Sequence, residues 1–218
     1  MYKSLKQQIQ IPTDTVRDPN LTENDFAFIL YLKLVTWKCG ERYTFEAANQ
    51  DIKQYTRIAD NKTIKKSLKN LYVHNYLLEQ IEELKQNKPI RFVLNPEKFD
   101  TKNRKEDQKF TQLPAKILYA LKDGKLNRKE VRLLYYLGSY INFQNPLRQF
   151  CFVSIERMTR ELNMSENTII KHYKLLKKKK LIEIDKHKLD YGYEEDGTLI
   201  WSKYNNHYFL RYEKIADL

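Results

Sequence analysis

Two segments of the chain carry lysines at a spacing that suits contact with a polyanion. In residues 166–179, polar side chains recur every three or four residues, which places them on one side of a helix. This polar stripe consists of Asn167, Lys171, Lys174 and Lys178. The opposite side is apolar, with Ile169, Tyr173 and Leu176. Such a helix can bury one face and offer its cations to a partner.

Residues 61–72 repeat this pattern. The inward positions of the predicted helix are Ile64, Leu68 and Leu71, and its outward positions are Lys62, Lys66 and Lys69. The simplest interpretation of either helix is a solvated lysine face. The same basic face in two corresponding helices favours a binding surface instead.

The residue types suit double-stranded DNA. Lysines neutralise phosphates and give affinity. The amide of Asn167 can form two hydrogen bonds with adenine, while Thr63 and Thr168 can bond bases or phosphates.

The composition agrees with an anionic partner. The chain has 40 Lys and Arg against 28 Asp and Glu, a formal charge of +12. This excess attracts nucleic acid or an anionic membrane. The first ten residues do not read as a signal peptide, and no run of about 20 apolar residues could span a bilayer. We expect a cytoplasmic protein with no membrane partner.

The chain contains an internal duplication. The segment beginning Leu21-Thr22-Glu23-Asn24-Asp25 matches the one beginning Leu126-Asn127-Arg128-Lys129-Glu130, at positions 105 apart. The lysine-rich segments and the pairs Tyr76-Leu77 and Leu181-Ile182 keep that offset, whereas Ile11-Pro12 and Leu113-Pro114 lie 102 apart. This repetition predicts two copies of one fold.

The second copy predicts helix, strand, helix, turn, helix and hairpin. Asn127 and Glu130 form a predicted capping box, and Ser154 and Ser165 are predicted N-caps. The strands are expected at residues 149–153, 181–185 and 206–210. This order is that of a helix-turn-helix with a wing, a DNA-reading arrangement.

The first copy predicts the same order. Its helices are expected at residues 25–37 and 47–55, and its third begins after the cap Asp60. A strand at residues 42–45 precedes a hairpin of residues 77–82 and 90–95. We therefore predict a mainly helical α+β fold of two tandem winged-helix domains, residues 1–100 and 108–218, joined by a polar linker at 101–107.

These segments resemble a known domain type. The stretches LTENDFAFILYLKL, NKTIKKSLKNLYVHNYLLEQI, LNRKEVRLLYYL and MSENTIIKHYKLLKKKKLIEI are similar to winged helix-turn-helix domains of bacterial regulators and of phage or plasmid replication proteins. The tandem layout is similar to that of plasmid replication initiators. The resemblance implies sequence-specific DNA binding in transcription or in replication initiation.

The predicted wings add cations that would grip the flanking DNA backbone. They are Lys85, Lys88 and Arg91 in the first wing, and Lys186, Lys188 and Lys203 in the second. The second wing also has aromatic residues and an acidic tip, Glu194-Glu195-Asp196-Gly197, which phosphate would repel. We expect this tip to face a protein partner, a second copy or solvent.

Nothing in the sequence predicts catalysis, a metal or a cofactor. The four histidines fall in no metal-binding spacing, and no phosphate-binding loop or nucleophile motif is present. The cysteines, Cys39 and Cys151, are predicted to be small buried residues rather than a disulfide. The alternative to a DNA-binding protein is a winged-helix scaffold for protein interactions.

Overall fold

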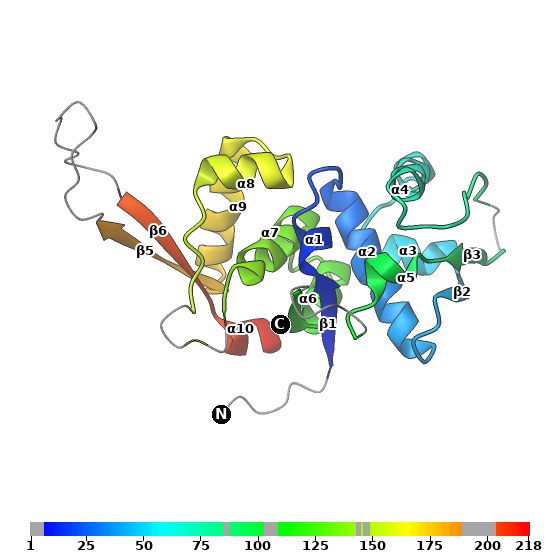
Figure 1. The fold of residues 1–218 in the computed structure, drawn as a ribbon, viewed down its shortest axis with the longest axis horizontal. Helices are drawn as coiled ribbons and strands as arrows, with labels where there is room; N and C mark the ends of the chain where they lie inside the picture. Colours follow the sequence, from blue (N-terminus) through cyan, green and yellow to red (C-terminus); the bar gives the residue numbers. More distant parts are fainter. Residues whose placement is uncertain (1–6, 85–87, 103–108, 143–144, 146–148, 189–203) are drawn as a thin grey trace.

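The computed structural model describes residues 7–84, 88–102, 109–142, 145, 149–188 and 204–218. Helices dominate, and three two-stranded antiparallel sheets lie among them (Figure 1). The structure therefore has the mixed α+β composition that the sequence predicts. No helix in these ranges combines the length and the apolar character needed to cross a membrane.

The described residues of the first half form eight helices and strands. In order they are β1 (Gln8–Pro12), α1 (Thr13–Val16), α2 (Glu23–Lys38), β2 (Thr44–Ala47), α3 (Asn49–Thr56), α4 (Asn61–Val73), β3 (Ile90–Val93) and α5 (Pro96–Phe99).

Another eight lie in the part of the second half that the structure describes. They are β4 (Phe110–Pro114), α6 (Lys116–Lys122), α7 (Arg128–Ser139), α8 (Ile155–Leu162), α9 (Glu166–Lys178), β5 (Ile182–Lys188), β6 (Tyr204–Leu210) and α10 (Tyr212–Ala216).

Matching caps begin the corresponding helices of the two halves. Thr22 and Asp25 form a capping box at the start of α2, and Asn127 and Glu130 form one at the start of α7. These reciprocal bonds satisfy N–H groups that a helix N-terminus leaves without partners. The predicted capping box at Asn127 is thereby confirmed.

Helices α4 and α9 repeat most closely, since they begin 105 residues apart and end 105 residues apart. Two residues after each helix ends, Asn75 and Lys180 both take the left-handed conformation at φ 59°. The preceding helices, α3 and α8, also end in left-handed residues, Arg57 and Asn163. The order of helix, left-handed residue and helix is therefore the same in the two halves.

The first predicted hairpin, of residues 77–82 with 90–95, is formed only at its base, where Leu78 N–H also donates to the carbonyl of Val93 at 2.8 Å. Beyond the single bridge between Leu77 and Leu94, residues 78–82 form no strand, and β3 instead pairs with β2 in the register Phe45 to Phe92. Phe45 and Phe92 stack with ring centroids 5.7 Å apart and lie in the core. In the segment 78–82, Leu78 is exposed and Ile81 is only partly buried against the core, so apolar burial does little to fix it as a strand.

The second predicted hairpin is present and longer than expected. Strands β5 and β6 pair from Ile182–Leu210 to Lys188–Tyr204. The predicted strand at residues 149–153 is reduced to one bridge between Cys151 and Tyr208. Phe150 stacks on His207 of β6 at 4.1 Å, so this segment lies against the hairpin without forming a full strand.

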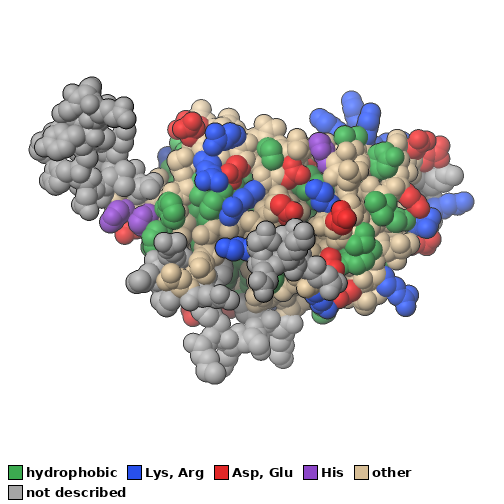
Figure 2. Space-filling view, viewed as in Figure 1, with side chains coloured by type: hydrophobic (Ala, Val, Ile, Leu, Met, Phe, Trp, Pro, Cys, Tyr) green, Lys and Arg blue, Asp and Glu red, His purple; other side chains and the backbone are tan. Residues whose placement is uncertain are grey.

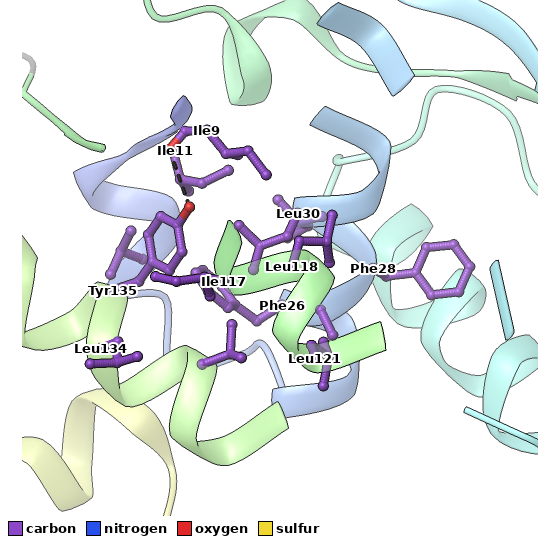
Figure 3. Packing of buried hydrophobic residues seen from close by; sticks show 14 of the residues in the cluster. Ile9, Ile11, Phe26, Phe28, Leu30, Ile117, Leu118, Leu121, Leu134 and Tyr135 are labelled. Carbon is purple, nitrogen blue, oxygen red and sulfur yellow. Dashed lines mark hydrogen bonds between the residues drawn. The ribbon is translucent and has the colours of Figure 1, made fainter. Parts of the chain in front are cut away.

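Both halves contribute to one continuous hydrophobic core. Figure 3 shows Phe26 and Leu30 of α2 beside Ile117 and Leu118 of α6. From α7, Tyr135 packs edge-on against Phe26 and donates its hydroxyl to the carbonyl of Ile9. The division of the chain at residues 101–107 stays a prediction, but the two halves are packed together.

Strand β1 of the first half pairs with β4 of the second. The register places Gln10 opposite Gln112, Ile9 opposite Leu113 and Ile11 opposite Thr111. Since Ile11 and Leu113 are the corresponding residues of the two copies, the pairing is nearly symmetric about Gln10 and Gln112. The sequence repeat contained these strands but did not indicate that they pair with each other.

The cysteine prediction holds for one residue only. Cys151 is fully buried, and burial raises the pKa of its thiol to about 12. Cys39 is exposed, contrary to the prediction. It caps the C-terminus of α2, where the chain turns outward into Gly40 at φ 70°.

Candidate nucleic-acid interface

The predicted outer face of α4 is exposed. Lys62, Lys66 and Lys69 are all accessible, and Thr63 is half-buried in the first turn. Lys and Arg side chains gather where α4 reaches the surface, at the upper right of Figure 2. The inner face is the predicted one, because Ile64, Leu68 and Leu71 are fully buried.

The outer face of α9 is exposed in the same way. Its accessible polar residues are Asn167, Lys171, Lys174 and Lys178, and Thr168 is half-buried. Ile169 and Leu176 are buried, while Tyr173 is half-buried against Tyr208 with centroids 6.0 Å apart. The hairpin of β5 and β6 therefore supports the inner side of α9.

Side-chain caps fix where both helices start. The Asp60 carboxylate accepts from the N–H of Thr63 at 2.7 Å, and Ser165 Oγ accepts from the N–H of Thr168 at 3.4 Å. The bond from Thr63 lowers the pKa of Asp60. Since each cap restrains the first turn, Thr63, Asn167 and Thr168 have defined positions.

The lysines of these two helices are available for a partner. Among the described residues, none of the six forms an ion pair with a carboxylate. The six are Lys62, Lys66, Lys69, Lys171, Lys174 and Lys178. Their charges are therefore free to neutralise phosphates.

The wing residues have mixed outcomes. Lys88 and Lys186 are exposed, whereas Arg91 forms an ion pair with Glu79 at 3.2 Å. Both partners of that pair are about half exposed, so it holds Arg91 only weakly. Lys85, the side chain of Lys188, Lys203 and the acidic tip at 194–197 lie outside the described residues.

A carboxylate that accepts three side-chain hydrogen bonds stabilises α8, the helix that precedes α9. Glu161 of α8 accepts hydrogen bonds from Tyr136 Oη at 2.8 Å, from Tyr140 Oη and from Arg157 Nε at 2.7 Å. Burial alone would raise the pKa of Glu161, but the bonds from Tyr140, Arg157 and Tyr136 outweigh it and lower that pKa. Tyr140 also lies under the Arg17 guanidinium, 3.5 Å from the ring centroid. These contacts connect α8 to α7 and to the first half.

A second ionic contact connects α9 to α7. The fully buried Glu130 carboxylate accepts from Lys179 Nζ at 2.7 Å, one residue after α9 ends. Nearby, burial lowers the pKa of His172 on α9, so its imidazole is held neutral more strongly than usual. The flank of α9 beside α7 is thus rigidly attached, and its lysine face is left outward.

The sequence did not single out two arginines that lie where the halves meet. Arg128 Nη1 donates to the carbonyls of Thr56 and Arg57. Arg132 is fully buried and donates to the carbonyls of Leu21 and Asp18. The only available signal was the charge of Arg132 within the apolar run Val131-Arg132-Leu133-Leu134, since a charge on a buried face needs fixed partners.

No group of three or more His, Cys, Asp and Glu residues that could hold a metal exists in the described ranges. Of the four histidines, His187 of β5 and His207 of β6 stack with ring centroids 4.9 Å apart, and His207 lies in a strand as predicted.

Comparison with known proteins agrees with this geometry. A family model described as a helix-turn-helix domain matches residues 124–182, which run from just before α7 to the first residue of β5. No curated protein matches the chain. The matched segment contains α8, the turn at Asn163 and α9 with its free lysines. This part of the chain is therefore similar to a helix-turn-helix domain, which indicates that the protein binds DNA.

Proposed function

We propose that the protein is a sequence-specific binder of double-stranded DNA that inserts α4 and α9 into two major-groove segments. Both halves would be winged helix-turn-helix modules. Its role would be the regulation of transcription or the initiation of plasmid or phage replication. The observation that carries the proposal is the pair of equally long, equally capped helices, α4 and α9, each with unpaired lysines on its outer face.

The nearly symmetric pairing of β1 with β4 supports a two-site arrangement. Gln10 Nε2 donates to Gln112 Oε1 at 3.0 Å at the centre of that pairing. A twofold axis at this pairing would relate the halves as the subunits of a dimer are related. A protein whose two reading helices are related by a twofold axis binds an inverted repeat. Its half-sites lie about 34 Å apart if both helices contact one side of the duplex.

The two half-sites need not be identical. Asn167 stands on α9 where α4 has Lys62, so α9 has the amide that reads adenine and α4 has a phosphate-binding cation. We expect an imperfect inverted repeat in which the half-site read by α9 is the more sharply defined.

Selection of bound sequences from random DNA tests the proposal. The wild-type protein should enrich one imperfect inverted repeat. The double variant Lys171→Glu, Lys174→Glu should bind that repeat roughly 100-fold more weakly, because two phosphate-neutralising charges are reversed. Lys109→Glu with Lys116→Glu is the matched control, since these exposed residues lie beside and within the β4–α6 segment.

Two outcomes would contradict the proposal. A wild-type protein that enriches no sequence at moderate salt is not a sequence-specific reader. If both double variants bind DNA as the wild type does, α9 does not contact the groove, and a scaffold for protein interactions becomes the better interpretation.

A further inference from the structure

A cleft lies between the two halves, beside both proposed reading helices. The lining residues that matter here are Glu23, Arg57, Gly124, Arg128, Lys129 and His172. Glu23 and Arg57 belong to the first half, and the other four belong to the second. Arg57 is in the turn just before α4, and His172 is on α9.

The cleft carries a positive charge. Three of its residues are cations, Arg57, Arg128 and Lys129, against one carboxylate, Glu23. Lys129 Nζ lies 3.7 Å from Glu23 Oε1, so that carboxylate is occupied by one of the three. The guanidinium groups of Arg57 and Arg128 have no carboxylate partner in the cleft lining. Arg57 Nη1 donates to the carbonyl of Lys122 and Arg128 Nη1 to the carbonyls of Thr56 and Arg57, and these neutral acceptors leave both positive charges available to an anion.

The position of Arg57 is set by its surroundings. Its backbone is left-handed at φ 57°, and its carbonyl accepts from Arg128 Nη1. Its guanidinium rests on Gly124, where a Cβ would lie only 3.2 Å from Arg57 Nη1. Gly124, at φ 78°, therefore leaves the space that the guanidinium occupies. Little ordering would be needed to bind a ligand here.

We propose that this cleft binds a phosphodiester group of the DNA strand that runs between the two major-groove segments. The inference rests on the proposed function, since a duplex that contacts α4 and α9 would carry its backbone past a cleft lined by Arg57, in the turn before α4, and by His172 of α9. Arg57 would make the direct contact, and Arg128 would hold the Arg57 backbone in place. Such a contact positions the duplex without reading its sequence.

Arg57→Asn is the sharpest test, because asparagine tolerates the left-handed backbone while removing the charge. On the selected DNA it should lower affinity roughly tenfold, the loss of one charge-assisted contact. It should also reduce the slope of log K against log salt by about 0.9, the value for one phosphate. Lys109→Gln, which removes an equal charge beside β4, should change neither quantity.

Gly124→Ala supplies an independent test through the same guanidinium. It should weaken binding because the new methyl group displaces Arg57. In the Arg57→Asn background it should have no further effect on affinity. If Gly124→Ala does not fold, as judged by thermal unfolding, Arg57→Asn decides the question alone.

The outcomes separate this inference from the proposed function. A wild-type protein that selects no sequence overturns both. A wild-type protein that selects a site, with Arg57→Asn and Lys109→Gln indistinguishable from it, overturns the cleft contact alone. Millimolar inorganic phosphate that raises the melting temperature of the wild type but not of Arg57→Asn, with DNA affinity unchanged in the variant, would assign the cleft to a free anion and also overturn the inference.

Discussion

Arg132 Nη2 donates to the carbonyl of Asp18 at 3.0 Å, so a fully buried cation of α7 holds the loop before α2. The same guanidinium also binds the carbonyl of Leu21. Burial lowers the pKa of Arg132 to about 10, which leaves it charged at neutral pH. The two halves are therefore joined by a buried polar contact as well as by apolar packing.

Arg132→Met should destabilise the protein by about 3 kcal/mol, because two buried carbonyls lose their donor. Urea denaturation at neutral pH measures this difference. Arg160→Met, at an exposed position of α8, should change the free energy of unfolding by less than about 0.5 kcal/mol. Equal stability of the two variants would mean that the Arg132 contact does not hold the halves together.

Ser165→Ala should cost about 1 kcal/mol of unfolding free energy, because α9 loses its N-cap. Ser165→Asn should retain most of that stability, since asparagine is an equally good cap. Both are measured by urea denaturation. An alanine variant as stable as the asparagine variant would show that the cap of α9 contributes nothing.

Glu161→Gln should remove an acid-sensitive part of the stability. The folded pKa of Glu161 lies below its usual value of 4.5, so its ionised form stabilises the folded state above pH 4.5. That stabilisation disappears as the pH falls through the folded pKa. The variant should therefore be less stable than the wild type at pH 7, and the gap should narrow below pH 4.5.

Urea denaturation across this pH range measures the effect, with Glu156→Gln as the control on the exposed side of α8. A gap that stays constant between neutral and acidic pH would exclude the hydrogen-bonded carboxylate as its source.

The two thiols should differ in reactivity in the folded protein. Cys39 is exposed and should be modified at once by a thiol-specific disulfide reagent, whereas Cys151 is buried with a raised pKa and should react only after unfolding. Mass spectrometry of the labelled protein identifies the modified residue. Rapid native labelling of Cys151 would contradict the packing around β6.

The sequence predicted the features that depend on near neighbours. The caps Asp60, Asn127 and Ser165 bond residues three positions away, and the apolar stripes of α4 and α9 follow from the helical period. Such features are contained in a short window of sequence, so they do not depend on how distant segments pack.

Features that depend on distant residues were not predictable in the same way. Phe92 was expected to pair with the segment 77–82. It lies in β3, which pairs with β2, where Phe45 is its partner. Arg57 and Gly124 meet across the two halves, so neither pattern nor spacing indicated a cleft. Long-range pairing is decided by the total apolar surface that a fold buries, which one segment does not reveal.

The cross-pairing of β1 with β4 limits how the protein can be divided for study. A fragment that starts at residue 109 would keep β4 but lose its hydrogen-bonding partner, leaving a bare strand edge that invites aggregation. Because Gln10 and Gln112 sit at matching places, each isolated half could pair its strand with that of another molecule and form an artificial homodimer. Truncated versions would therefore report on exchanged dimers, and mutations in the intact chain are the safer tool.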